Sequence, residues 1–144
     1  MVFIKEELSY EVERKNMEGD LMPDVWLRLG HKGRKRILVG FVYREHKPWN
    51  STDASIKGQE ERLRIWLETR RVTWQGTDET YLLGDINLDW NKSGDRNYRN
   101  AKMLKKMEVE LAEVGWSQLV KENTHYSNSN GNITESLIDH VWTN

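Results

Sequence analysis

The residue types best suited to chemistry follow one apolar segment, in the decapeptide YLLGDINLDW at residues 81–90. Its apolar start predicts a buried strand, and the strand delivers Gly84, Asp85 and Asn87 to its carboxyl end, where side chains can meet a ligand. Alternate spacing puts Asp85 and Asn87 on one face. There a carboxylate can accept a proton from water or bind a divalent cation, and an amide can donate to a phosphate oxygen. This pair suits phosphoryl chemistry, although the same residue types also form ordinary strand-ending turns.

The segments before this motif indicate a β-meander. Short runs rich in β-branched and aromatic residues are separated by glycine, proline, asparagine or charged clusters. The run ILVGFVY is nearly all apolar, so we expect that strand to be buried on both faces. The predicted strands cover residues 2–4, 10–13, 25–29 and 37–43, and the last two form the clearest hairpin.

Two amphipathic helices are predicted around the motif. The first, at residues 55–72, has Ile56, Leu63, Trp66, Leu67 and Arg70 on one side, and the second, at 97–114, has Ala101, Leu104, Met107, Leu111 and Val114. Gly115 is expected to end the second helix. Further strands are predicted at residues 80–85, 116–120 and 136–142. Strands joined partly by hairpins and partly by helices indicate a mixed α/β sandwich in a single domain.

Composition narrows the possible ligands and partners. The chain of 144 residues has 22 Lys and Arg against 23 Asp and Glu, so no overall charge attracts a polyanion. The absence of cysteine leaves carboxylates, amides and histidines as metal ligands, which favours hard cations. The basic cluster at residues 31–36 could contact a nucleic-acid backbone, but it is more typical of a solvated hairpin tip. Neither a signal peptide nor a membrane span is predicted, so we expect an intracellular protein, nuclear or cytoplasmic.

Three blocks of the sequence resemble the endonuclease/exonuclease/phosphatase superfamily. LLGDIN, at residues 82–87, is similar to its Gly-Asp-Phe-Asn motif, with Ile86 in the position of Phe. ILVGFVYREH is similar to the strand that ends in the family's phosphate-contacting tyrosine, here Tyr43. Thr124 with the later Ser136-x-Ile138-Asp139 resembles the family's Ser-x-Ile-Asp block. FIKEELSYEV and DVWLRL also resemble segments in endonuclease domains of non-LTR retrotransposons.

The resemblance implies a mixed-sheet α/β sandwich of the endonuclease/exonuclease/phosphatase type and a divalent-metal-dependent phosphodiesterase using Mg²⁺ or Mn²⁺. By this likeness Asp85 activates or orients the attacking water and is also a candidate metal ligand, and Asn87 polarises the phosphate. Tyr43 contacts the phosphate in the transition state, although without the family context a core aromatic would be the simpler interpretation. Asp139 completes the polar floor. Because Asp139 lies in an apolar stretch, we expect a partner or metal beside it.

The sequence departs from the family pattern at both ends. The family's first asparagine, its metal-binding glutamate and its catalytic Asp-His pair have no counterpart, and Glu6, Glu7 and Glu11 lie too late in the chain to be that glutamate. His140 matches a variable position and is not assigned to catalysis. Residues 1–144 are therefore expected to be the central and later part of a domain that is incomplete and inactive alone.

The implied partners are DNA and a reverse transcriptase domain in the parent polypeptide, for which the endonuclease would nick its target. Two alternatives stay open. The chain could be a catalytically dead binding or scaffold module on the same fold, or a remnant of a phosphatase of the same superfamily. A sheet lacking strands would also leave unpaired edges and an apolar face, which favour association.

Overall fold

A mixed six-stranded sheet forms the centre of the protein. The computed structural model describes residues 3–6, 8–16, 22–30, 36–45, 56–74 and 79–144. The first three strands form the predicted antiparallel meander, and β3 then pairs in parallel with β4 across a helical connection. In spatial order the strands are β1 (Ser9–Asn16), β2 (Asp24–Gly30), β3 (Ile37–Tyr43), β4 (Glu79–Asp85), β8 (Asp139–Thr143) and β5 (Ser117–Gln118).

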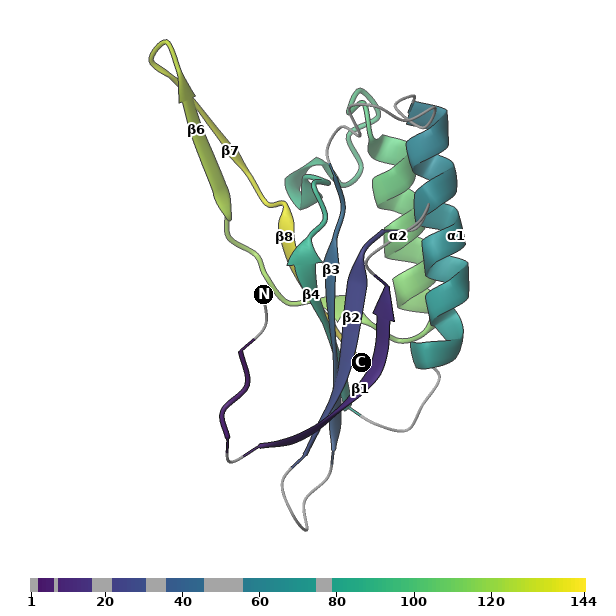
Figure 1. Ribbon diagram of the computed structural model, residues 1–144. Helices are drawn as coiled ribbons and strands as arrows, with labels where there is room; N and C mark the ends of the chain where they lie inside the picture. The colour runs from purple at the N-terminus through teal and green to yellow at the C-terminus, as the bar shows by residue number, and fades with distance from the viewer. Residues whose placement is uncertain (1–2, 7, 17–21, 31–35, 46–55, 75–78) are drawn as a thin grey trace.

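Two helices pack side by side against one face of this sheet (Figure 1). They are α1 (Ile56–Trp74) and α2 (Ala101–Glu113), as the apolar periodicity predicts. Gly115 ends α2 with φ 81°, the Gly115 N–H donates to Ala112 O at 2.9 Å, and the Trp116 N–H donates to Leu111 O at 2.9 Å. This is a Schellman ending, in which a left-handed residue satisfies the last carbonyl groups of the helix.

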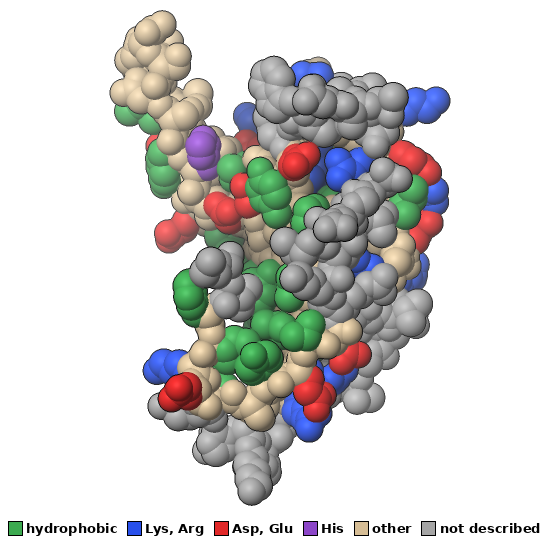
Figure 2. Space-filling view, viewed as in Figure 1, with side chains coloured by type: hydrophobic (Ala, Val, Ile, Leu, Met, Phe, Trp, Pro, Cys, Tyr) green, Lys and Arg blue, Asp and Glu red, His purple; other side chains and the backbone are tan. Residues whose placement is uncertain are grey.

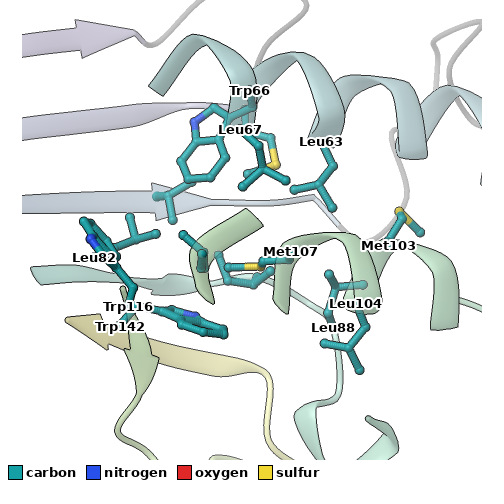
Figure 3. Close-up of a cluster of buried hydrophobic side chains, with 14 of the residues drawn as sticks. Leu63, Trp66, Leu67, Leu82, Leu88, Met103, Leu104, Met107, Trp116 and Trp142 are labelled. Carbon is teal, nitrogen blue, oxygen red and sulfur yellow. The ribbon is translucent and has the colours of Figure 1, made fainter. Parts of the chain in front are cut away.

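The hydrophobic core lies between the helices and the sheet (Figure 3). Alternate strand residues and one side of each helix supply it, which is the arrangement expected for a sheet covered on one face. Leu88, just after β4, lies in the same cluster. Its members include Trp26, Leu38, Leu63, Trp66, Leu67, Leu82, Met103, Leu104, Met107, Leu111, Trp116 and Trp142.

One buried ion pair joins the start of β2 to α1. Asp24 and Arg70 both have fully buried side chains, and Arg70 binds the carboxylate through Nε and through Nη2, the latter at 2.7 Å from Oδ1. The same carboxylate accepts from the indole N–H groups of Trp26 at 3.0 Å and Trp66 at 3.1 Å. These donors offset the cost of burying the charge of Asp24.

A two-stranded hairpin extends away from the sheet (Figure 1). It consists of β6 (His125–Ser129) and β7 (Asn132–Ser136), and the side chains of β6 are all exposed. Asn130 and Gly131, with φ 53° and 83°, form its tip, and positive φ at both central residues suits the right-handed twist of a hairpin. The segment is mostly polar, and its two large apolar side chains, Tyr126 and Ile133, are exposed, which is why its composition suggests a loop.

Three predicted strands differ from the structure. Phe3 and Ile4 are not in a strand, because they pair with none of the strands that the structure describes, and Val2 lies outside the described residues. The predicted strand at 116–120 is shorter in the structure, where Ser117–Gln118 pair with β8. The 136–142 strand divides, because Ser136 pairs within the hairpin whereas β8 begins at Asp139. The basic cluster at 31–36 falls mostly outside the described residues.

The face of the sheet turned away from the helices carries an apolar surface (Figure 2). Strand register puts Leu27 and Val39 on this face, where both are buried, beside Tyr10 and Val12 of β1, which are exposed. At one end of the same face lies Tyr43.

Among the described residues, no helix has the length and apolar character to cross a membrane.

Candidate functional site

Three of the four predicted site residues form a row across neighbouring strands. Tyr43 ends β3 and is paired with Asp85, the last residue of β4, in the parallel register. Asp85 is in turn paired with Asp139, the first residue of β8, in the antiparallel register. Lateral partners in a sheet project to the same face. The three side chains therefore lie together on the face away from the helices.

Gly84 allows β3 and β4 to approach closely beside this row. A Cβ atom added at Gly84 would overlap the backbone carbonyl of Val42. Because that obstacle is main chain, no rotamer change can relieve it. The glycine of the Gly-Asp-x-Asn motif thus has a packing role that is separate from chemistry.

Asn87 reaches the site by a turn and not by strand alternation. β4 ends at Asp85, and Asn87 has φ 52°, so the expectation that the two residues share a strand face is wrong. The Asn87 N–H donates to Asp85 Oδ1 at 3.1 Å, and Asn87 Nδ2 donates to Arg44 O at 2.7 Å. The two side chains still meet, because the left-handed residue turns the chain back onto the carboxylate.

Arg44, which follows Tyr43, lies behind this turn and was not predicted as a site residue. Its side chain is buried, and its Nη1 donates to the carbonyl oxygens of Ile86 and Asn87, each at 3.1 Å. Burial lowers the pKa of Arg44, opposed in part by Asp85. An arginine nevertheless stays charged in a protein. The signal for this role in the sequence is no more than a charged residue directly after Tyr43.

The surroundings of Asp85 disfavour the ionised form of its carboxyl. Burial has the largest effect and raises the pKa of this carboxyl, and the neighbouring Asp139 raises it further. Hydrogen bonds from Asn87, and the Coulombic interaction with His125, lower the pKa of Asp85 in part. Two adjacent carboxylates repel each other, and a divalent cation relieves that repulsion. The described residues nevertheless contain no group of three His, Cys, Asp or Glu able to hold a metal ion.

Asp139 is exposed, which corrects the argument that its apolar neighbours bury it. Its neighbours alternate across the strand, so they bury the other face. Thr124 fixes its backbone, because Thr124 Oγ1 accepts from the N–H groups of Ile138 at 3.2 Å and Asp139 at 3.0 Å. His125, which follows Thr124 in the chain, is exposed and lies near Asp85. His125 was not predicted, since its place depends on the start of the β6–β7 hairpin.

His140 lies on the opposite face of β8 from Asp139 and is buried. The indole N–H of Trp142 donates to its Nδ1 at 3.4 Å, so its Nε2 is the atom that donates to Leu88 O, at 2.9 Å. Burial lowers the pKa of His140 and favours the neutral ring. This histidine is therefore a buried residue of the core.

The fold has counterparts among solved structures of endonuclease/exonuclease/phosphatase proteins. The endonuclease domain of TRAS1, a telomere-specific non-LTR retrotransposon, is 16% identical with a TM-score of 0.61, and the match covers 96% of this chain and 56% of that domain. An endonuclease/exonuclease/phosphatase family protein from Bacteroides thetaiotaomicron is 14% identical with a TM-score of 0.50, covering 93% and 50%. No protein-family model and no curated protein sequence matches. The chain therefore has the endonuclease/exonuclease/phosphatase fold over about half the length of such domains.

Proposed function

We propose that this chain is the phosphate-facing part of a divalent-metal-dependent phosphodiesterase, a DNA endonuclease of the non-LTR retrotransposon type. The single observation that carries this proposal is the row of Tyr43, Asp85 and Asp139, with Asn87 turned onto Asp85 at the same end of the sheet. The likeness of the fold to the TRAS1 endonuclease domain supports the lineage. In the parent polypeptide the domain nicks target DNA for an attached reverse transcriptase.

Each side chain in this row has a distinct task in the proposed reaction. Asp85 accepts the proton of the attacking water or orients it, a task that suits a carboxyl whose pKa is raised by burial. Asn87 donates an amide N–H to a phosphate oxygen. Tyr43 is 47% exposed, and its hydroxyl donates to a second phosphate oxygen as negative charge develops on the phosphate.

Asp85 and Asp139 also fit part of the coordination shell of Mg²⁺ or Mn²⁺. Both ions prefer oxygen ligands, and Mg²⁺ is commonly held by one or two carboxylates with water and substrate phosphate completing the shell. When bound, such an ion would stabilise charge on the phosphoryl oxygens. We propose that the remaining protein ligands and the proton donor for the leaving group come from polypeptide outside residues 1–144.

The first prediction concerns nicking of supercoiled plasmid. The 144-residue chain alone is expected to leave the plasmid intact with Mg²⁺ or Mn²⁺, because removing several members of a cooperating site costs most of the rate. A longer polypeptide that includes the flanking coding sequence is expected to nick it. Gel electrophoresis of the relaxed and supercoiled forms measures both.

Asp85→Ala in the longer polypeptide is expected to reduce nicking by at least about a hundredfold, in line with loss of a catalytic base. Asp95→Ala is the matched control, because Asp95 is an exposed loop aspartate whose carboxylate accepts from the N–H of nearby Asn97, at 2.9 Å. Nicking by the longer polypeptide that persists in Asp85→Ala would contradict the proposed role. Retained DNA binding with no cleavage in any form would favour the scaffold alternative.

A further inference from the structure

A buried guanidinium supports the Asp85–Asn87 turn from behind. Arg44 is 4% exposed, and its Nη1 donates to the carbonyl oxygens of Ile86 and Asn87, each at 3.1 Å. These two carbonyls belong to consecutive residues of the turn. One donor group therefore fixes the orientation of two successive peptide planes.

The backbone of Arg44 closes the same turn from its other end. The Arg44 N–H donates to Asp85 O at 2.9 Å, and Asn87 Nδ2 donates to Arg44 O at 2.7 Å. Asn87 has φ 52°, a left-handed conformation that asparagine adopts more readily than most residues with a side chain but that is still less common than right-handed backbone. Such a conformation persists where the surrounding contacts determine it, and here most of those contacts come from Arg44.

The second branch of the guanidinium ties the turn to both helices. Arg44 Nη2 donates to Gln59 Oε1 on α1 at 2.7 Å and approaches Met103 Sδ on α2 at 3.4 Å. A planar fork with several donors can reach all these partners at once. A lysine at this position would keep the charge but would offer a single nitrogen.

We propose that Arg44 is a positioning residue, which holds the Asp85 carboxylate and the Asn87 amide together at the open end of the sheet for phosphoryl chemistry. The catalytic purpose of this positioning rests on the proposed function, whereas the positioning itself follows from the hydrogen bonds of Arg44. Arg44 acts only through the turn and makes no contact with substrate.

The test compares Arg44→Met and Arg44→Lys with the wild-type chain by NMR. Arg64→Met is the matched control, because Arg64 is an α1 arginine whose exposed guanidinium binds Glu61 and Glu68. The chemical shifts and HN–Hα coupling of Asn87 report its φ. The Asp85 Cγ signal reports the titration of that carboxyl, and Mn²⁺-induced broadening at Asp85 and Asp139 reports cation binding.

Both Arg44 variants are expected to lose the left-handed signature of Asn87 and to move the Asp85 titration to higher pH, because the turn releases the Asn87 N–H from Asp85 Oδ1. Mn²⁺ binding is expected to weaken by about tenfold, as for loss of a group that orients a metal ligand. Arg64→Met should leave all three readouts unchanged.

Wild-type values for Asn87 and Asp85 in both variants, with only a lower melting temperature, would overturn the inference and leave Arg44 a packing residue. Where Arg44→Met does not fold, Arg44→Lys decides, because it keeps a cation at the site. Absence of Mn²⁺ broadening in the wild-type chain would count against the proposed metal chemistry alone. The Asn87 and Asp85 readouts would still test the role of Arg44.

Discussion

Asp85, a proposed site residue, has a carboxyl that is stabilised less well than the buried carboxylate of Asp24. Its carboxyl lies beside Asp139 and is partly withdrawn from water, so its ionised form is disfavoured in the folded chain. Asp24, by contrast, is fully buried yet surrounded by four donor groups from Trp26, Trp66 and Arg70. A carboxylate left poorly compensated is typical of groups selected for reactivity.

The prediction at the residue scale is that Asp85→Asn stabilises the chain at neutral pH. Because the folded-state pKa of Asp85 is raised, ionisation costs stability above that pKa, and the cost disappears as the pH falls and the carboxyl is protonated. The gain in melting temperature should therefore be largest at neutral pH and should vanish in acid. Thermal melts of both proteins between pH 3 and about 8 measure it.

Glu113→Gln is the control, since Glu113 is an exposed helix carboxylate that pairs with Arg71 at the surface. It should show no comparable gain at neutral pH. An Asp85→Asn protein that is less stable than the wild type at neutral pH would contradict the prediction, because it would mean that the ionised carboxylate stabilises the fold.

At the scale of elements, α1 is held to the sheet by a polar anchor as well as by apolar packing. Leu63, Trp66 and Leu67 are buried against the sheet, and Arg70, on the same side of the helix, reaches Asp24 at the start of β2. The helical period correctly groups Arg70 with the apolar residues. Only the packing explains why an arginine belongs there, because its partner lies 46 residues away in the chain.

The prediction at the element scale is that Asp24→Ala lowers the free energy of unfolding by about 3 to 5 kcal/mol, the usual cost of leaving one member of a buried ion pair alone. Urea denaturation followed by circular dichroism measures the loss. The m-value should not change, because the same surface is exposed on unfolding. Glu61→Ala, which breaks an exposed pair with Arg64, is the control and should have little effect. Equal losses in the two variants would contradict the anchoring role of Asp24.

For the molecule as a whole, the helices cover one face of the sheet, and the opposite face, called the open face here, exposes apolar side chains of β1 among the described residues (Figures 1 and 2). Tyr10 and Val12, each 56% exposed, lie on the open face together with the row that contains Tyr43. Exposed apolar sheet surfaces favour association. The chain spans 56% of the TRAS1 endonuclease domain, so its open face need not be open in a longer polypeptide.

The prediction at the molecular scale is that the 144-residue chain self-associates, and that Tyr10→Lys reduces this association. A charge on the open face must be desolvated when two such faces meet. Sedimentation velocity over a range of concentrations measures the distribution of species. Tyr126→Lys is the control, because Tyr126 is 62% exposed but belongs to the β6–β7 hairpin. A monodisperse wild-type monomer with a cooperative thermal transition would contradict the prediction.

The sequence by itself determined the elements whose periodicity is strong. The meander, both helices and the strand before Asp85 follow from local patterns, because burial of one face requires apolar residues at fixed spacing. The same patterns led to the mixed α/β fold. They failed for the exposed β6–β7 hairpin, where no apolar face exists, although its Asn-Gly turn was a usable signal.

Tertiary structure alone decided which chemical groups meet. Tyr43, Asp85 and Asp139 become neighbours through the register of three strands that lie far apart in the chain, and register depends on packing across the whole sheet. Arg44 follows Tyr43 in a stretch that resembles a polar loop. It is buried with its guanidinium donating to the carbonyl groups of Ile86 and Asn87, and these acceptors come within its reach once the turn has folded against β3.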